Sequence, residues 1–470
     1  MSDKNSKKLR LTFCAGTGTV TGANFLLEGP LDKNGNLLEG EAGKKFLIDC
    51  GLTQGTKLAD DVNWQDFQYD PASIDILFIT HAHIDHIGRI PKLVHDGFRG
   101  KIVSTKATKD LALPMLMDTV GILGRDTADG LDEIYNEDTV KKIMNLWEGI
   151  DYHQKMNIAG GFQMSYKDAG HILGSGMLEV VFNGKKIVFT GDLGNSPSPI
   201  LRDTEVVDDA DYLVMESVYG DRNHESRDER NKMLERAIEE NYKNKGVLIV
   251  PTFSLERSQE LLYEINNFVE NKQIPRMPIY FDSPLGIHLT EVYRKHTECF
   301  NENAKKLIAS GDDIFTFPGL HVTLSTEDSK AIAESSNPKI IIAGSGMSNG
   351  GRIIHHEQRF LQHPENTFLL TGYQAVGTMG RMIEDGATHV MINGVDTKVR
   401  ARVVKIAGYS GHKDSNHLLE FVSHMADKVK QIFVVMGEPK SSLFLVQKIR
   451  DNFALNATAP SVNDVVELEM

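Results

Sequence analysis

The sequence predicts an α/β protein made of two folded units, with the second unit inserted into the first. At 470 residues the chain is too long for one ordinary hydrophobic core. Residues 1–211 alternate short apolar runs with turns, whereas residues 212–387 alternate strands with helices. Residues 388–470 return to short strands and end in a strand–helix pair, so we expect this last part to pack on the first.

In residues 1–211, apolar runs that are closely followed by glycine, aspartate or asparagine predict strands. Longer stretches with helical periodicity predict two helices, over Thr105–Leu123 and Asp138–Trp147. The predicted strands are Leu9–Phe13, Asn24–Leu27, Phe46–Ile48, Ile74–Thr80, Met177–Phe182 and Ile187–Thr190.

The middle part has the alternation that is typical of a parallel sheet covered by helices. Two helices are predicted over Asp228–Asn244 and Ser258–Asn271, and a further one begins near Gly351. The last strand–helix pair of the chain is expected around Gln431–Asn452. The predicted strands of the middle part are Tyr212–Met215, Gly246–Pro251, Pro278–Phe281, Lys339–Ala343 and Thr367–Leu370.

The composition describes a globular protein of a reducing compartment. Charged residues make up 25% of the chain, and no apolar run approaches the ~18 residues of a membrane span. The N-terminus is polar and basic, without the apolar core of a signal peptide. The three cysteines, Cys14, Cys50 and Cys299, lie far apart and show neither disulfide nor metal-ligand spacing. We therefore expect a cytoplasmic protein.

The net charge of −14 argues against a protein that simply coats nucleic acid, because such proteins carry a basic surface. The same charge is compatible with a nuclease. A local basic groove and bound metal cations can hold a phosphate on an otherwise acidic body.

Three histidines and a carboxylate follow the apolar strand Ile74–Thr80 directly. Polar groups at this density cannot all lie in a buried core without partners. The spacing lets two histidines point one way and the aspartate with the third histidine the other, which suits two adjacent cations. The segment reads Thr80-His81-Ala82-His83-Ile84-Asp85-His86.

Three more residues of metal-binding type follow or flank apolar stretches. Asp49 lies in Phe46–Gly51, His171 in Gly170–Ser175 and Asp192 in Phe189–Gly194. Taken singly, a residue next to glycine is usually part of a turn. All three together with the histidine segment, each at a strand end, favour a metal site.

This ordered set resembles the metallo-β-lactamase superfamily, whose members bind two zinc ions. The resemblance implies an αββα sandwich with sheets from about 1–211 and 388–470, and it makes Asp49 the carboxylate that orients a ligand histidine. Two zinc ions would acidify a shared water and neutralise developing oxyanion charge. The implied ligands are His81, His83 and His171 for the first zinc, Asp85 and His86 for the second, and Asp192 for both.

Later segments resemble the β-CASP subgroup, RNA-processing nucleases related to the endonuclease subunit of the polyadenylation machinery. The match runs in order from Cys14 to Glu438. It implies an inserted α/β β-CASP domain over 212–387 and zinc-dependent hydrolysis of phosphodiester bonds in single-stranded RNA. The matching segments are Met215–Asp221, Pro251–Glu260, Phe281–Leu285, Gly344–Arg352 and Tyr409–Asp414.

The resemblance also implies that Glu216 and His412 act together, to protonate the leaving oxygen or to hold the scissile phosphate. A departing alkoxide is costly without a proton, so the chemistry needs such a group. Asp85 joins them as a catalytic residue, and Asp414 is expected to orient His412.

The glycine-rich segment Gly344–Arg352 predicts a phosphate-binding loop. Glycines free backbone N–H groups, and the helix that follows would direct its N-terminus at an anion. Arg257 and Arg381 are further candidates for holding the RNA backbone. The residues predicted to contact phosphate are Ser345, Gly346, Gly351 and Arg352.

One position departs from the pattern of the RNA-cutting members, which carry a histidine there as a further ligand of the second zinc. The segment reads Val434-Val435-Met436-Gly437-Glu438, and no histidine occurs beyond His424. Because a thioether is a weak partner for zinc, we expect the second zinc to dissociate more easily than the first. DNA-repair members have an apolar residue at this place.

Several interpretations therefore stay open. The first is an RNA-processing endonuclease or exonuclease, and the second is a nuclease that acts on DNA. A third is a catalytically weakened scaffold that binds RNA, and a fourth is a small-ester hydrolase. A homodimer is implied by the resemblance alone.

Overall fold

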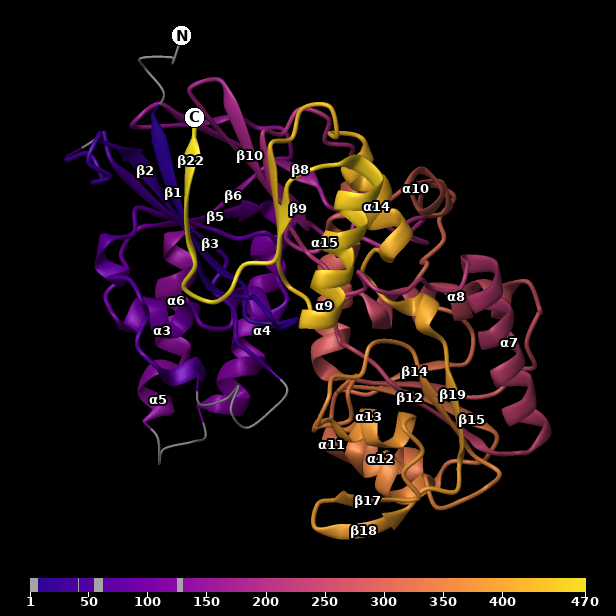
Figure 1. Ribbon diagram of the computed structural model, residues 1–470. Coiled ribbons are helices and arrows are strands. Elements are labelled where there is room, and N and C mark those ends of the chain that lie inside the picture. The colour runs from indigo at the N-terminus through magenta and orange to yellow at the C-terminus, as the bar shows by residue number, and fades with distance from the viewer. Residues whose placement is uncertain (1–6, 41, 55–61, 125–129) are drawn as a thin grey trace. The chain divides into compact units, whose positions relative to one another are not determined.

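The computed structural model describes residues 7–40, 42–54, 62–124 and 130–470. The chain divides into two compact units (Figure 1). The outer unit comprises residues 1–196, 203–223 and 412–470. The inserted unit comprises residues 197–202 and 224–411.

The outer unit contains two seven-stranded sheets. The strands of its first sheet are β1 (Lys8–Ala15), β2 (Asn24–Leu31), β3 (Lys44–Ile48), β4 (Ile76–Phe78), β5 (Lys101–Thr105), β6 (Trp147–Ile150) and β22 (Val465–Glu469). Their order is β22-β1-β2-β3-β4-β5-β6, and β3, β4, β5 and β6 run parallel. Figure 1 shows β22, in yellow, beside indigo β1, with which it pairs antiparallel.

The second sheet repeats this plan. Its strands are β7 (Met156–Ile158), β8 (Phe162–Asp168), β9 (Gly176–Phe182), β10 (Lys185–Phe189), β11 (Tyr212–Met215), β20 (Gln431–Val434) and β21 (Ala457–Thr458). Their order is β21-β20-β11-β10-β9-β8-β7, and β10, β11, β20 and β21 run parallel. In both sheets, several parallel strands therefore end at the same edge, where the loops that follow them can converge.

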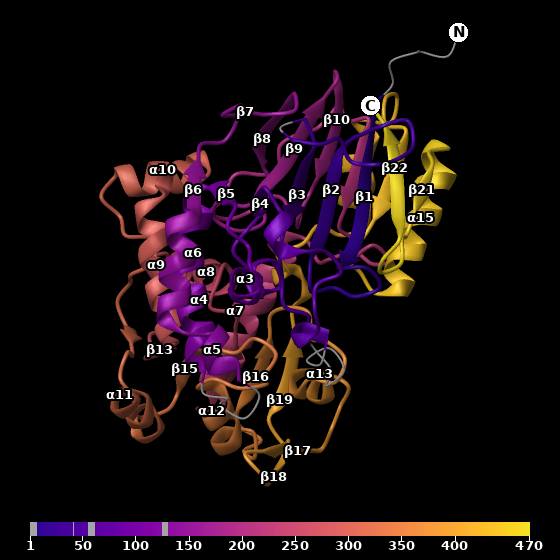
Figure 2. The same cartoon turned by 90° about the vertical axis from the view of Figure 1, so that its left-hand side faces the viewer.

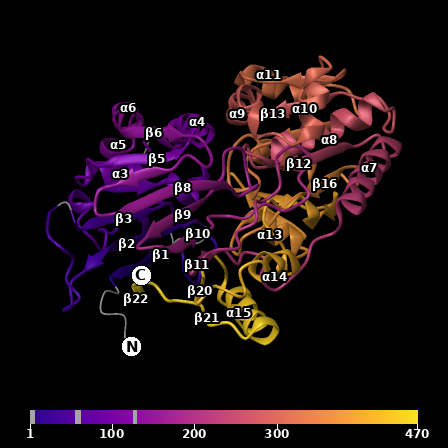
Figure 3. The same cartoon turned by 90° about the horizontal axis from the view of Figure 1, so that it is seen from above.

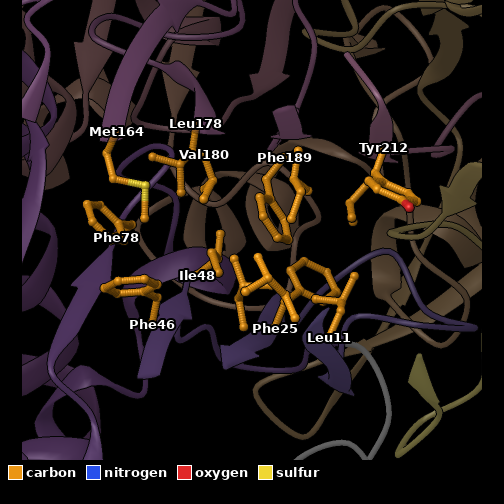
Figure 4. Close-up of a cluster of buried hydrophobic side chains, with 14 of the residues drawn as sticks. Leu11, Phe25, Phe46, Ile48, Phe78, Met164, Leu178, Val180, Phe189 and Tyr212 are labelled. Carbon is orange, nitrogen blue, oxygen red and sulfur yellow. The ribbon is translucent and has the colours of Figure 1, made fainter. Parts of the chain in front are cut away.

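Aromatic and aliphatic side chains from the two sheets meet in one core (Figure 4). Strand β1 shows how the sequence produces this core. Successive side chains of a strand point to opposite faces, and every second residue of β1, namely Leu9, Leu11 and Phe13, is fully buried. The rings of Phe46 and Phe162, from opposite sheets, lie edge to face with centroids 5.0 Å apart. Packing of this kind fixes how the two sheets are stacked and hence where their loops meet.

Helices cover the outer faces of the two sheets. Four of them, α3, α4, α5 and α6, lie beside the first sheet, as Figure 2 shows, and α14 and α15 pack on the second sheet (Figure 3). The outer unit thus has the αββα layering that the resemblance implied. Its helices are α2 (Ile84–Ile87), α3 (Ile90–His95), α4 (Lys106–Leu123), α5 (Leu131–Ile134), α6 (Glu137–Leu146), α14 (Ser415–Ser423), α15 (Pro439–Phe453) and the 3-10 turn η1 (Pro71–Ser73).

The inserted unit is an α/β domain with one six-stranded parallel sheet of order β14-β13-β15-β12-β16-β19. The sheet strands and the separate hairpin β17–β18 are β12 (Val247–Pro251), β13 (Ile279–Asp282), β14 (Leu320–Val322), β15 (Lys339–Ala343), β16 (Thr367–Leu370), β17 (His389–Ile392), β18 (Val395–Lys398) and β19 (Arg402–Lys405). The helices are α7 (Arg227–Lys243), α8 (Arg257–Glu270), α9 (Pro284–Lys295), α10 (Glu302–Ala309), α11 (Thr326–Ala331), α12 (Ile353–Phe360) and α13 (Met379–Glu384), with 3-10 turns η2 (Thr297–Cys299), η3 (Ile332–Glu334) and η4 (Ala407–Tyr409).

The unit boundaries fall at 223/224 and 411/412, later than the 211/212 and 387/388 expected from the sequence. Strand pairing explains the difference. Strand β11 is bonded to β10 and β20 and so belongs to the outer unit. Strand β19 extends the sheet of the inserted unit through β16. The local sequence does not show which strands β11 and β19 pair with, so it could not place these boundaries.

Within the described residues, no helix is both long and apolar enough to cross a membrane.

Candidate active site

Most residues of the candidate site follow the carboxyl ends of strands of the outer unit, and two of them, Asp85 and His86, lie in the short helix α2. Strands β3 and β4 are neighbours, so the loops after them start side by side. Strands β10 and β11 are neighbours in the second sheet, with the same consequence. These two edges carry Asp49 after β3, His81, His83, Asp85 and His86 after β4, Asp192 after β10 and Glu216 after β11, while His171 follows β8.

Four donor atoms of His81, His83, His171 and Asp192 lie within 4.8 Å of one another. The Nδ1 atom of His83 is 3.1 Å from His81 Nε2 and 3.2 Å from His171 Nε2. Asp192 Oδ2 is 3.4 Å from His81 Nε2 and 3.5 Å from His171 Nε2. A tetrahedral zinc ion with ordinary bond lengths needs ligand atoms about 3.3 Å apart, so this donor set fits one zinc ion.

Two imidazoles of this set, His81 and His83, are held in the neutral form that can act as a ligand. Burial, together with the neighbouring imidazoles, lowers the pKa of His81 and holds the pKa of His83 well below its usual range. A metal ion binds only the unprotonated nitrogen, so this environment favours metal over protons at neutral pH.

Asp49 lies against His86, a histidine of the predicted second ligand set. Its Oδ2 accepts a hydrogen bond of 2.8 Å from His86 Nδ1, which leaves His86 Nε2 for a metal. The carboxylate is itself fixed, because Oδ1 accepts from the Thr80 N–H and Oδ2 from the Thr80 hydroxyl, each at 2.8 Å. The Thr80 hydroxyl also lies 3.1 Å from His81 Nδ1.

Two buried atoms next to this set have no hydrogen-bond partner among the described residues. They are His86 Nε2 and Asp192 Oδ1, which lie 3.5 Å apart. A carboxylate oxygen of Asp85 is 4.0 Å from the same His86 nitrogen. Buried polar atoms without a partner are costly, and a second cation among these three side chains would satisfy both.

Met436 does not complete this second donor set. Its side chain is 2% exposed and belongs to the hydrophobic core, with the sulfur beside Gly16. A cavity of about 10 Å³ is lined by both Met436 and His86. The protein therefore supplies three side chains here and an apolar wall where the RNA-cutting members have a histidine.

Glu216 and His412 form the second half of the site. His412 Nδ1 lies 3.2 Å from Glu216 Oε1 and 3.9 Å from Asp192 Oδ2. Glu216 is fixed by the Leu193 N–H, which donates to Oε1 at 2.7 Å. Burial alone would lower the pKa of His412, but Glu216 outweighs it and raises that pKa to about 9.

The carboxylate that contacts His412 Nδ1 is thus Glu216, and the expected role of Asp414 in orienting His412 stays a prediction. Asp414 caps helix α14 by accepting from the His417 N–H at 3.0 Å, and it pairs with His417 Nδ1 at 2.7 Å. Its place at a helix start, visible in the sequence, was a signal for this capping role.

Sequence reasoning also missed residues that support the site without touching a metal. Thr80 holds Asp49, and the Ser175 hydroxyl accepts from the His171 N–H at 3.0 Å. Gly191, at φ +54°, has no room for a side chain, because a Cβ would lie 2.6 Å from Thr80. The signal available was a hydroxyl or glycine close in sequence to a predicted ligand, one residue away for Thr80 and Gly191 and four for Ser175.

The glycine-rich loop lies in the inserted unit, after β15. Arg352 is engaged within the protein. Its guanidinium donates to Asp282 Oδ1 at 2.7 Å and to the carbonyls of Thr323 and Leu324 at 3.0 and 2.7 Å. The prediction that Arg352 contacts phosphate is therefore not supported by its geometry, since the side chain is used to fix the loop.

The same holds for the two other arginines considered. Arg257 is 6% exposed and pairs with Glu260 on its own helix, and Arg381 pairs with Asp385 at 2.9 Å. The backbone requires a glycine at position 351, because this residue adopts φ +70° and a Cβ there would lie 2.4 Å from the Gly344 carbonyl oxygen.

Family comparisons agree with this geometry. The family described as "Beta-Casp domain" matches residues 258–383, and "Zn-dependent metallo-hydrolase RNA specificity domain" matches residues 396–460. Residues 21–218 match "Anti-Pycsar protein Apyc1". The chain belongs to the β-CASP family of zinc-dependent metallo-hydrolases with the metallo-β-lactamase fold, as its sequence motifs predicted.

Individual relatives support the same family. The chain is 32% identical to Ribonuclease TTHA0252 of Thermus thermophilus over 86% of its length and 90% of that protein. It is 32% identical to an RNase J-like protein of Methanocaldococcus jannaschii, with the same two coverages. It is 27% identical to transcription termination factor FttA of Methanosarcina mazei, over 98% of this chain and 72% of that one.

A solved structure shares the fold. It is the crystal structure of a protein of unknown function from Enterococcus faecalis V583, with a TM-score of 0.54 and 13% sequence identity. The alignment covers 98% of this chain and 100% of that one.

Proposed function

We propose that the protein hydrolyses phosphodiester bonds in single-stranded RNA at a zinc site built from the outer unit. The proposal rests on one observation, that an incomplete metal-binding set lies next to a histidine that can donate a proton. Two buried metal-ligand atoms, His86 Nε2 and Asp192 Oδ1, lie 3.5 Å apart and have no hydrogen-bond partner among the described residues. Next to them lies a histidine whose pKa is raised to about 9. The printed names of two relatives, a ribonuclease and an RNase J-like protein, support RNA as the substrate.

His81, His83, His171 and Asp192 would hold the first zinc, and Asp85 and His86 with Asp192 the second. Bound zinc supplies Lewis acidity, which activates water at neutral pH and neutralises charge that develops on phosphoryl oxygens. Asp49 and Thr80 keep His86 in the orientation that presents Nε2.

His412 would act as the proton donor to the leaving oxygen. Glu216 holds its Nδ1 and stabilises the protonated imidazole, so His412 carries a proton at neutral pH. With Nδ1 turned to Glu216, Nε2 would be the atom that donates to the leaving oxygen. The side chain is 22% exposed, so a substrate can reach it.

Backbone groups of Ser345, Gly346 and Gly351 would contact RNA phosphates in the inserted unit. Glycine-rich turns ahead of a helix present N–H groups to anions, and helix α12 follows this loop directly. Arg352 contributes by fixing the loop through Asp282.

The second zinc would dissociate more easily than the first. The second set lacks a fourth protein ligand because Met436 points into the core. The measurement is zinc content after extended dialysis, with one tightly held ion per chain expected. Two equally tight zincs would contradict this proposal.

The decisive test of function is incubation of purified protein with an end-labelled single strand, supplied as RNA and as matched DNA. Wild type and Asp192→Ala are compared in added zinc. We expect wild type alone to cleave RNA, and the product ladder then separates internal cutting from end-wise degradation.

Other outcomes favour the alternatives. Cleavage of DNA alone would assign the protein to DNA processing. It would also explain Met436, because DNA-repair members have an apolar residue at this position. Binding of RNA without cleavage would favour a scaffold subunit. A cytoplasmic location agrees with the free thiols of Cys14, Cys50 and Cys299, and a homodimer stays a prediction.

A further inference from the structure

An exposed aromatic ring stands in the loop that follows strand β12 of the inserted unit. Phe253 is 38% exposed, although Thr252 before it and Leu255 after it are 1% and 3% exposed. Single exposed apolar residues are common and need no explanation by themselves. What this ring packs against makes it different.

One face of the Phe253 ring lies flat on the backbone of Gly346 in the glycine-rich loop. A Cβ on Gly346 would be 2.6 Å from Cδ2 of the ring, and 2.8 and 2.9 Å from Cε2 and Cγ on either side of it. For an approach in the ring plane the two flanking carbons would be much farther away than the nearest one. Near-equal distances mean that Gly346 faces one flat side of the ring, so a planar ligand could stack only on the opposite side.

Both partners of this contact are held in place. The Phe253 carbonyl accepts from the Ser258 hydroxyl at 2.7 Å and from the Ser258 N–H at 3.2 Å. The Gly346 carbonyl accepts from Gln374 Nε2 at 3.0 Å, and Gln374 is 2% exposed. A ring fixed in this way loses little further freedom when a ligand covers it, so binding to it costs little entropy.

The position in the fold is one where ligands bind. Strands β12, β13, β15 and β16 are neighbours in a parallel sheet, and the loops that follow them start at the same edge. In sheets of this kind the crevice beyond the carboxyl ends of the strands is the usual ligand site. Hydroxyl groups lie close by, since Ser254 Oγ and Ser283 Oγ are 3.0 Å apart at this edge.

We propose that Phe253 is a stacking platform for one nucleobase of single-stranded RNA, with Gly346 as the support beneath the ring. This inference rests on the proposed function. Unpaired bases present flat faces that stack on aromatic side chains regardless of sequence, and such stacking combines with backbone phosphate contacts in proteins that bind single strands. This role also explains why residue 346 is a glycine, because any side chain there would displace the ring.

The test measures RNA binding in an Asp192→Ala background, which prevents cleavage, with a fluorescently labelled single-stranded oligonucleotide. Phe253→Leu keeps an apolar side chain but removes the flat face, and we expect affinity to fall roughly 5- to 150-fold. Phe253→Trp is expected to bind as well as the parent. Phe444→Leu on α15 is the matched control, since Phe444 is 41% exposed, and it is expected to change nothing.

Oligonucleotides with one base removed at each position in turn identify the stacked base. We expect one position at which loss of the base weakens binding to Phe253 protein but no longer weakens binding to Phe253→Leu. If Phe253→Leu does not fold, as judged by circular dichroism, Phe253→Trp replaces it. RNA should quench the added tryptophan, whereas a tryptophan introduced by Phe444→Trp should not respond.

The outcomes separate this inference from the function on which it rests. If the parent protein cleaves and binds RNA, and Phe253→Leu binds it equally tightly, the stacking platform alone is wrong. An unquenched tryptophan at 253 overturns it as well. If the parent neither binds nor cleaves RNA, the proposed function fails and the platform fails with it.

Discussion

Two clusters of buried histidine and aspartate, one in each unit, differ in what surrounds them. In the inserted unit, Asp282 accepts hydrogen bonds from Thr323 and Ser329 at 2.6 Å, from Arg352 at 2.7 Å and from His356 at 2.8 Å. In the outer unit, His86 Nε2 and Asp192 Oδ1 are equally buried, lie 3.5 Å apart and have no hydrogen-bond partner among the described residues.

The difference teaches how to separate a structural cluster from a ligand site. Burial opposes ionisation of Asp282, but its four donors outweigh burial and lower the pKa to about 2, so the carboxylate is satisfied by the protein itself. In the outer cluster, burial lowers the pKa of His81 and His83 instead, and ring nitrogens of these two residues lie 3.1 Å apart. Only the second arrangement is incomplete without a cation.

The largest expected effect is on catalysis. Changing His83→Ala removes one of three imidazoles from the first donor set, and RNA cleavage should fall by roughly 1,000-fold or more. Zinc content, measured by elemental analysis, should fall with it. His356→Ala is the matched control, because His356 donates to Asp282, and zinc content should stay that of wild type. Zinc loss in the control would break the comparison.

A stability effect is expected from the closed cluster. Asp282→Asn removes the charge opposite Arg352 and His356, and unfolding in urea should show a loss of about 3 kcal/mol. The zinc bound per chain should not change. Unaltered stability would mean that this cluster is not held together by its charges.

An intermediate effect is expected on metal retention. Met436→His places an imidazole beside the small cavity that His86 also lines, and the second zinc should be retained at least roughly 10-fold more tightly. Competition with a chelator of known affinity measures it. Met436→Leu is the control, since it keeps the apolar wall and adds no donor. Equal retention in both variants would rule out position 436 as a ligand position.

The smallest expected effect depends on pH. Burial raises the pKa of Glu357 to about 7, although the Ser348 hydroxyl donates to it at 2.6 Å. The folded state therefore prefers neutral Glu357, and its contribution is fully present below pH 4.5 and lost as pH rises to about 7.

Glu357→Gln keeps an acceptor for Ser348 and cannot ionise. We expect the variant to be more stable than wild type by about 1–2 kcal/mol at pH 8, and the two to converge near pH 5. Thermal unfolding across this pH range is the measurement. A constant difference at every pH would show that Glu357 does not titrate in the folded state.

Many elements could be predicted from local sequence. Strand β11 has the predicted bounds Tyr212–Met215, and the predicted helix over Thr105–Leu123 is α4, Lys106–Leu123. Strands such as β6 and β7 were missed, because four-residue and three-residue segments of mixed polarity carry no clear period. Pairing stabilises them, of β6 with the distant strand β5 and of β7 with the next strand β8.

The sequence by itself determined the chemistry of this protein. The spacing of His81, His83, Asp85 and His86, with Asp49, His171 and Asp192 at strand ends, names the donor atoms because ligand type and order are local properties. The absence of a histidine at position 436 was equally visible.

Only the tertiary structure decided which of the remaining polar side chains already bond to other residues of the protein. Arg352 and Arg257 look available in the sequence, but Asp282 and Glu260 already pair with them. Phe253 looks like any apolar residue until Gly346 is placed against one face of its ring. The physical reason is that a side chain's free bonding capacity depends on neighbours brought together by folding, and chain order does not specify them.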